Sequence, residues 1–150
     1  MCHYCGCREI PLIKEFIAEH ERVTDAAGDA LRALERGDTA HAADLVDFMA
    51  RELGAHWRGE ENGLFRVMRT DPEYADYIEA LEREHRELAA LLPVLDLTDP
   101  ADVRTLVEAV DELHHHIAKE EDGLFPASLT ALDGDEWNIS MAAWREAHPT

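Results

Sequence analysis

A ten-residue pattern that occurs twice constrains the fold of this chain more than any other feature. Segments 56–65 and 116–125 share the pattern H-x-x-x-E-E-x-G-L-F, with identical residues at six matched positions. A histidine and a glutamate four positions apart lie on the same face of a helix, one turn from each other. Two helices that each carry such a pair can face a single metal site. The repeat therefore predicts a helical protein with a metal site between its helices.

Four long stretches of the chain have the apolar periodicity of amphipathic helices. Gly37, Pro72 and Pro100 mark the turns between them. Almost no segment has the pattern of a strand. We therefore predict an all-α fold, an antiparallel up-down-up-down four-helix bundle with a short C-terminal helical tail. The expected helices span about residues 10–36, 39–69, 72–95 and 101–132.

The length of 150 residues indicates one folded domain with two short extensions. We place a cysteine-rich N-terminal leader at 1–9, the bundle at 10–132 and a C-terminal tail at 133–150. The tail contains Trp137, Ile139, Met141 and Trp144. We expect it to form a short helix that caps one end of the bundle and covers apolar surface there.

The charge of the chain limits its partners. It has 14 basic and 33 acidic residues, for a net charge of −19. So acidic a surface repels phosphate backbones, so we expect no nucleic-acid partner, and it either attracts cations or serves solubility alone. No apolar run approaches the roughly 20 residues of a membrane helix, so we expect no membrane partner. No apolar signal core follows Met1, which predicts a cytoplasmic location. A homodimer is one assembly that such a bundle allows.

Four histidines, one on each expected helix, are predicted to lie in one layer. In an antiparallel bundle, residues at equal distances from a turn lie at the same height. The midpoints between successive histidines are positions 38, 70.5 and 100.5, and each falls on a predicted turn. All four also lie on the apolar stripes, and a glutamate follows two of them by one turn. The set is His20, His56, His85, His116, Glu60 and Glu120.

Each of these features alone has a simpler interpretation. A histidine on an apolar face is usually a hydrogen-bonded core residue, and a His–Glu pair is often a surface pair worth about 0.2–0.5 kcal/mol. Two carboxylates in the same buried layer are different, because their burial without cations costs several kcal/mol per charge. Imidazole and carboxylate ligands without thiolate suit iron, manganese or zinc. Six ligands exceed one tetrahedral zinc site, which predicts two ions with bridging carboxylates.

The histidine-bearing segments resemble those of the hemerythrin HHE cation-binding family. The resemblance rests on the repeated pattern and on the segment E-H-R-E-L at 84–88, and it covers about residues 10–130. It implies a four-helix bundle with a non-haem centre of two iron ions, which are carboxylate-bridged and oxo- or hydroxo-bridged. It assigns His20 and His56 to one iron, His85 and His116 to the other, and Glu60 and Glu120 as bridges.

The third expected helix departs from the oxygen-carrying members of this family. Those members place two histidines one turn apart on that helix. Here the positions four residues from His85 are Leu81 and Ala89, which cannot bind metal. The resemblance therefore implies that one iron lacks a protein nitrogen, and that water or a carboxylate such as Glu82 or Glu121 takes its place. An exchangeable position favours chemistry over reversible carriage.

Several functions remain open at this point. The first is a diiron protein that binds or reacts with dioxygen, peroxide or nitric oxide, with catalase-like or scavenging activity as the preferred version. The second is an oxygen- or iron-sensing module without turnover, and the third is a bundle with a stabilising metal. A further alternative is a ferritin-like carboxylate diiron protein, because 82–85 and 112–115 both read Glu-x-x-His. That alternative needs His115 as a ligand in the metal layer. Without it, we expect His115 to lie beside the ligands or to be exposed.

The remaining cysteines and histidines carry weaker signals. Cys2, Cys5 and Cys7 are too few and too close for a disulfide framework. With His3 they could bind a metal, react as thiols, or simply pack as a terminus. His41 and His148 are expected at the surface.

Overall fold

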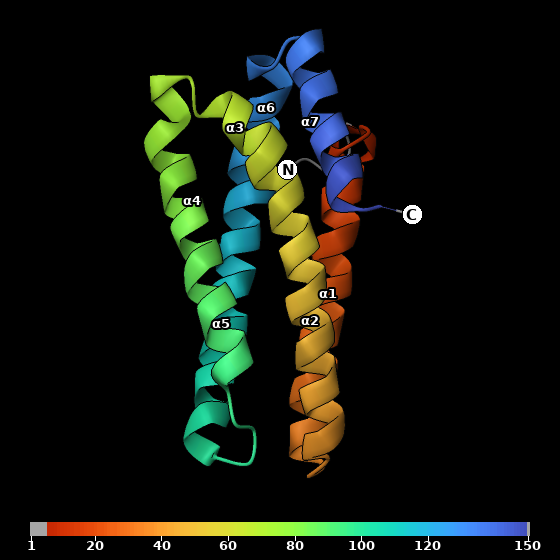
Figure 1. The fold of residues 1–150 in the computed structure, drawn as a ribbon, viewed down its shortest axis with the longest axis vertical. Helices are drawn as coiled ribbons and strands as arrows, with labels where there is room; N and C mark the ends of the chain where they lie inside the picture. Colours follow the sequence, from red (N-terminus) through yellow and green to blue (C-terminus); the bar gives the residue numbers. More distant parts are fainter. Residues whose placement is uncertain (1–5, 150) are drawn as a thin grey trace.

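The computed structural model describes residues 6–149, and every regular element in that range is helical. The four long helices are α1 (Ile13–Glu35), α2 (Thr39–Gly59), α4 (Pro72–Leu91) and α5 (Pro100–Lys119). Figure 1 shows them alternating in direction along one long axis, with α1 beside α2 and α4 beside α5. The predicted all-α antiparallel four-helix bundle is confirmed. No helix among residues 6–149 has the length and hydropathy needed to cross a lipid bilayer.

The helices begin where the sequence provides capping residues. Asp38, Asp71 and Asp99 each accept a hydrogen bond from a backbone N–H of the first turn, at 3.2, 2.9 and 2.9 Å. A proline follows the last two caps at the first helical position, where its missing N–H costs nothing. Gly37 has a φ of 79°, the left-handed conformation that closes the turn after α1. These local signals keep the turns short and fix the register between neighbouring helices.

The second and fourth expected helices are not continuous α-helices. A π-helical turn, η2 (Glu60–Leu64), leads into α3 (Phe65–Met68), and another, η4 (Glu120–Leu124), leads into α6 (Phe125–Ala131). Both turns fall inside the repeated pattern. The third helix likewise ends as a short 3-10 turn, η3 (Leu92–Val94). Insertions of π-helical geometry are rare and occur frequently at functional sites, and apolar periodicity does not reveal them.

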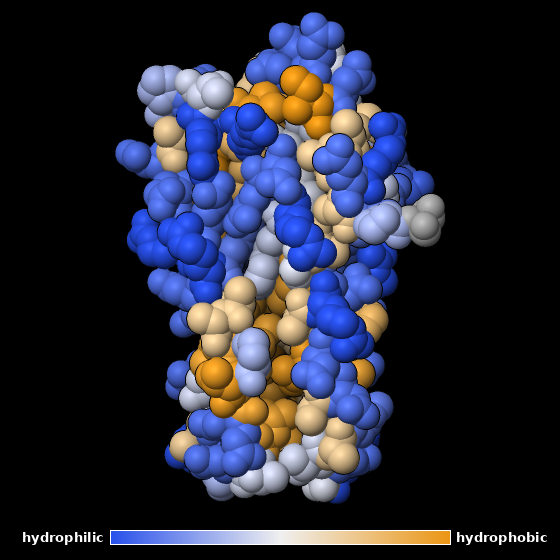
Figure 2. Space-filling view, in the orientation of Figure 1, coloured by the Kyte–Doolittle hydropathy of each residue, from blue (hydrophilic) through white to orange (hydrophobic). Residues whose placement is uncertain are grey.

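The apolar core consists of two clusters at opposite ends of the bundle. The cluster near the α1–α2 turn is rich in alanine, with Ala26, Ala27, Ala30 and Ala33 buried on α1. The other contains large side chains, including Phe16, Phe65 and Phe125. In Figure 2 apolar residues gather in a hollow in the lower half of this face, whereas the upper half is mainly hydrophilic. The buried histidines and glutamates described below separate the two clusters.

The C-terminal tail is a helix, as predicted. α7 (Gly134–Ala147) begins with a capping box, in which Asp133 and Glu136 each accept from the other's backbone N–H. It packs against α2 and η2. A Cβ atom at Gly63 would lie 2.9 Å from the Cβ of Ala143 and 3.0 Å from the backbone of Ser140. The glycine of the first pattern therefore allows α7 to approach the π-helical turn. Two further elements, η1 (Cys7–Glu9) and the turn that follows it, precede α1.

Candidate metal centre

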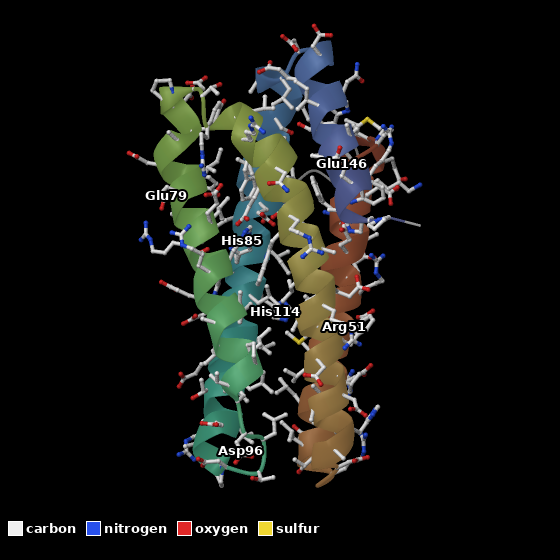
Figure 3. All side chains as sticks on the ribbon, viewed as in Figure 1. Arg51, Glu79, His85, Asp96, His114 and Glu146 are labelled. Atoms are coloured by element: carbon white, nitrogen blue, oxygen red, sulfur yellow. The ribbon has the colours of Figure 1, made fainter. Side chains whose placement is uncertain are left out.

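The four histidines predicted to share a layer lie together in the core. Their exposed fractions are between 1% and 5%. The Nε2 atoms of His20 and His56 are 3.1 Å apart, and those of His85 and His116 are 3.0 Å apart. His85, labelled in Figure 3, lies on α4 with its ring inside the bundle, while charged residues such as Arg51 and Glu79 lie on the outside. The structure thus forms two imidazole pairs, one from α1–α2 and one from α4–α5.

Two glutamates connect the pairs. Glu60 and Glu120 are completely buried. One oxygen of Glu60 is 2.9 Å from His56 Nε2, and its other oxygen is 3.4 Å from His85 Nε2. One oxygen of Glu120 is 3.0 Å from His20 Nε2, and its other oxygen is 3.6 Å from His116 Nε2. Each carboxylate therefore presents one oxygen to each imidazole pair, which is the arrangement of a bridging ligand.

These residues form two adjacent groups suited to a dinuclear metal site. His20, His56, Glu60 and Glu120 each offer a ligand atom within 4.8 Å of the others. His85, His116 and Glu120 do the same. Glu120 belongs to both groups.

The outer nitrogen of every histidine faces a further carboxylate. His20 Nδ1 is 2.8 Å from Glu121, His85 Nδ1 is 2.9 Å from Glu61, and His116 Nδ1 is 2.9 Å from Glu84. His56 Nδ1 lies 3.6 Å from Glu19. An ionised carboxylate only accepts, so each Nδ1 carries a hydrogen, which leaves each Nε2 as the nitrogen that can bind a metal. Carboxylates in this position fix the orientation of metal-binding imidazoles.

The outer carboxylates follow a rule that the sequence contains twice. The second glutamate of each repeated pattern faces a histidine on another helix, Glu61 with His85 and Glu121 with His20. The glutamate that precedes His20 or His85 faces the histidine of the next pattern along the chain, Glu19 with His56 and Glu84 with His116. From the sequence, Glu121 was considered only as a ligand beside His85, and Glu19, Glu61 and Glu84 were given no contact with a histidine. The Glu-His dipeptides at 19–20 and 84–85, matched in both halves of the chain, are the signal that could have identified them.

The C-terminal helix joins this outer layer. Trp144 Nε1 donates to Glu19 at 3.0 Å, and His148 Nε2 lies 2.6 Å from the other Glu19 oxygen. Trp144 and His148 also stack, with ring centroids 4.6 Å apart. The expectation that His148 lies at the surface is wrong, because only 20% of its side chain is exposed. The tail thus supports the environment of His56 in addition to covering apolar surface.

Burial and close approach shift the pKa values of the site residues. Burial and the neighbouring Glu120 raise the pKa of Glu60 to about 8. Burial alone would lower the pKa of His116, but Glu120, Glu60 and Glu84 raise it to about 9. His85 differs, because burial outweighs Glu61 and lowers its pKa. Without a metal, Glu60 and His116 therefore hold protons at neutral pH, and a cation that binds here must displace them.

Several oxygen atoms of the two inner glutamates lack hydrogen-bond partners. Both oxygens of Glu60 and one of Glu120 are buried and accept no hydrogen bond from the residues that the structure describes. Unpaired buried carboxylate oxygens cost several kcal/mol. Ring nitrogens lie 2.9–3.6 Å from these oxygens without forming a hydrogen bond. Metal ions between the nitrogens and the oxygens would satisfy both, so these side chains fit a dinuclear centre.

Three residues named with the predicted ligands lie elsewhere. Glu121 was considered for the position beside His85, but it contacts His20 and also Arg8, at 3.0 Å. Glu82 forms an ion pair with Arg69. Neither carboxylate therefore completes the site beside His85, because each is held by a different basic partner.

The third is His115, whose side chain is 73% exposed and lies 3.7 Å from Asp111. One residue along an α-helix is a rotation of about 100°, so His115 points outward when His116 points inward. The ferritin-like alternative, which needs His115 among the ligands, is contradicted. Cys2 and Cys5 lie outside the described residues, so their predicted roles are untested, and Cys7 is half-buried.

A cavity adjoins the second histidine pair. It has a volume of about 340 Å³, and its lining includes His85, His116 and Trp57. The ring of Trp57 stacks on His85, with centroids 4.8 Å apart. Phe125 covers His20 in a similar way, at 5.9 Å, but neither His20 nor His56 lines this cavity. The two halves of the candidate site therefore differ in access.

Comparisons with known proteins agree with the geometry. The family model of the hemerythrin HHE cation binding domain matches residues 12–128 of the chain. That range contains all six residues of the two metal-binding groups. Comparisons with curated proteins and with solved structures give no match.

Proposed function

Because this chain belongs to the hemerythrin HHE cation-binding family, we propose that it is a non-haem diiron protein that binds or reacts with dioxygen, peroxide or nitric oxide. One observation carries the proposal. Glu60 and Glu120 each offer one oxygen to the His20–His56 pair and one to the His85–His116 pair. Such carboxylates couple two ions, and a single structural ion would need only one of the pairs.

Iron is our choice of metal. The inner donors are imidazoles and carboxylates without a thiolate, a set that suits iron and is shared by manganese and zinc. Bound iron would supply redox and Lewis-acid chemistry toward small oxygen-containing ligands. The chain's own residues hold the imidazoles rigidly through the outer carboxylates. Phe125 stacks on His20, and Phe65 and Trp57 stack on His85, so aromatic rings pack against these imidazoles.

Peroxide decomposition is the activity we prefer. The His85–His116 pair borders a cavity, so a small ligand can reach this half of the centre. No carboxylate from Glu82 or Glu121 occupies that side. Access through the cavity and the absence of a further protein ligand favour exchange of small ligands and turnover over a closed structural site.

The test combines metal analysis, absorption spectroscopy and peroxide decay on the iron-loaded protein. We expect two irons per chain and peroxide loss faster than with the same amount of free iron. His116→Ala should lower this rate strongly, whereas His114→Ala, which is exposed and does not line the cavity, serves as the matched control and should not. Decay no faster than with free iron would remove the enzymatic version. Lost stability without lost activity in His56→Ala would favour a purely structural metal.

A sensing module without turnover is the second candidate. The observation that favours it is the contact from His56 through Glu19 to Trp144 and His148 near the C-terminus. A change in the ligands of one ion could thereby alter the packing of α7. Near-ultraviolet dichroism of the diferrous protein with and without dioxygen tests this. A stable, reversible adduct with a changed tryptophan signal supports sensing, and an unchanged signal excludes it.

The proposal includes a small diatomic or peroxide ligand as the partner of the centre. It also includes a cytoplasmic location and, for assembly, a homodimer as one form. Analytical ultracentrifugation and fractionation of expressing cells test these two predictions.

A further inference from the structure

The cavity beside His85 and His116 is larger than dioxygen or peroxide requires. Its volume is about 340 Å³. A water molecule takes roughly 30 Å³ in the liquid, so the space exceeds that of a diatomic ligand by roughly tenfold. Pockets for small organic molecules begin at about 300 Å³. The cavity therefore has the size of an organic ligand site and opens directly on one half of the metal centre.

The apolar part of the cavity wall comes from three helices, and the rest is formed by glutamates and histidines. Leu88 and Leu91 line it from α4, Leu113 and Ala109 from α5, and Trp57 from α2. Trp57 and Leu113 are buried, so these walls form part of the protein core. An aromatic ring in this space would contact leucine side chains and the indole, which favours an apolar, planar body.

The indole of Trp57 adds a polar feature. Its side chain is only 7% exposed, and Nε1 has no hydrogen-bond partner within residues 6–149. A buried N–H without an acceptor costs about 1–3 kcal/mol. This nitrogen has almost no accessible surface, so the indole must turn toward the cavity before a ligand hydroxyl or carbonyl oxygen can accept from it. The site is thus equipped for a ligand that carries one hydrogen-bond acceptor.

The rim of the cavity is acidic. Glu84, Glu87 and Glu112 line it, and the last two are exposed. The chain as a whole carries a net charge of −19. Carboxylates around a largely apolar cavity repel anions and favour neutral or cationic molecules. The volume of the cavity, its apolar residues, the indole N–H and the acidic residues around it therefore all favour one class of ligand.

We propose that this cavity binds a small amphipathic aromatic molecule, neutral or cationic, against the His85–His116 half of the centre. This inference goes beyond the proposed reaction with dioxygen or peroxide, because it assigns an organic ligand to the same side of the site. Occupancy would place the ring over Trp57 and next to the second histidine pair.

The test is calorimetric titration of the metal-loaded protein with benzyl alcohol, benzylamine and benzoate, which have similar size and different charge. We expect the alcohol and the amine to bind one per chain, and benzoate to bind at least tenfold more weakly. Equal binding of benzoate, or no binding of any probe at 10 mM, overturns the proposal. Titrations of the zinc-loaded protein, which has no redox chemistry, distinguish a failure here from a failure of the diiron function.

Variants locate the binding within the cavity. Leu88→Trp fills it and should weaken both binders at least tenfold, whereas Leu95→Trp, half-buried and outside the cavity, is the control. Trp57→Phe removes the N–H donor and should weaken benzyl alcohol severalfold but not protonated benzylamine, which has no acceptor. Glu112→Gln should weaken benzylamine alone. Unchanged binding in all three cavity variants overturns the proposal, and the last two remain informative if Leu88→Trp does not fold.

Discussion

The two helical hairpins of the bundle, α1–α2 and α4–α5, contribute matching ligand sets yet differ in packing. Each supplies two buried histidines, one inner glutamate and two outer glutamates. In the first hairpin, alanines on α1 let α2 pack closely. In the second, a cavity lies along α4 and α5 beside His116. The same ligand chemistry thus sits in a closed half and an accessible half.

The difference extends to charge. Burial alone would lower the pKa of His20 and His56, but nearby glutamates raise both, that of His56 strongly. In the accessible half the two histidines differ, because burial lowers the pKa of His85 even with Glu61 beside it, whereas neighbouring glutamates raise that of His116 to about 9. The comparison teaches that access and protonation are set by the packing around the ligands, since the ligand types are the same in both halves.

Removal of the shared carboxylate should have the largest effect, because it breaks both halves together. Glu120 belongs to both metal-binding groups. We expect Glu120→Gln to lose most of both ions, while Glu60→Gln, which is absent from the second group, retains more metal. Metal content after dialysis, measured by elemental analysis, checks this. Equal retention by the two variants would contradict the assignment of Glu120 as the shared ligand.

Removal of one outer carboxylate should affect one half at a time. We expect Glu121→Gln, which frees His20 in the closed half, to weaken metal binding by about 10–100-fold, the usual effect of such partners. Glu61→Gln should have a smaller effect, because the Glu61 side chain is 36% exposed and that of Glu121 15% exposed. Competition with a chelator measures both affinities. A larger loss in Glu61→Gln would reverse the proposed order of the halves.

The pH dependence should separate the two histidines of the accessible half. A pKa of about 9 keeps His116 protonated at neutral pH in the metal-free protein, so metal must displace that proton. Affinity for zinc should therefore rise with pH, by about tenfold per unit for each proton released, and level off above pH 9. His85→Ala should keep this slope, because the pKa of His85 is lowered. A flat affinity between pH 6.5 and 8.5 would contradict it.

The same pKa values fix the sign for stability without metal. The folded-state pKa of His116 lies above its ordinary value of 6.5, so its stabilisation is complete below pH 6.5 and disappears as the pH passes about 9. The raised pKa of Glu60 acts in the same direction up to about pH 8. The melting temperature of the metal-free protein should thus fall across this range, and metal should reduce the slope.

The glycines of the two patterns should give the smallest difference. A Cβ at Gly63 meets Ala143 and the backbone of Ser140, so Gly63→Ala should destabilise the protein by about 1–3 kcal/mol through overpacking. A Cβ at Gly123 meets only the Tyr77 side chain, at 2.7 Å. Tyr77 can move at the cost of its hydrogen bond to the Lys119 carbonyl, about 1 kcal/mol. Urea denaturation of both variants measures the difference, which equal losses would contradict.

The sequence predicted the bundle and the histidine layer because both depend on helical periodicity and turn positions. His20, His56, His85 and His116 could be aligned by arithmetic on the turns alone. The π-helical turns could not be predicted, because a single wider turn of five residues does not visibly change the spacing of apolar residues along the helix. Glu19 and Glu84 escaped notice for a different reason. In a chain with 33 acidic residues, only a contact with a histidine distinguishes an outer carboxylate from the other glutamates, and the sequence does not show that contact.

His148 shows the same limit at longer range. Nothing in the sequence near it indicates a contact with Glu19, which lies more than one hundred positions earlier. The contact depends on α7 packing against η2, and that packing depends on the missing side chain at Gly63. Such a chain of tertiary contacts becomes visible only in three dimensions.

The origin of each histidine pair has a consequence for how the protein assembles. His20 and His56 come from consecutive helices, as do His85 and His116, so each pair requires only a local hairpin. Local contacts form early because closing a short loop costs little entropy. The bridging contacts of Glu60 and Glu120 instead join the two hairpins across the layer. We therefore expect each hairpin to form a nascent ion site during folding, and the carboxylates to join the two when the hairpins dock.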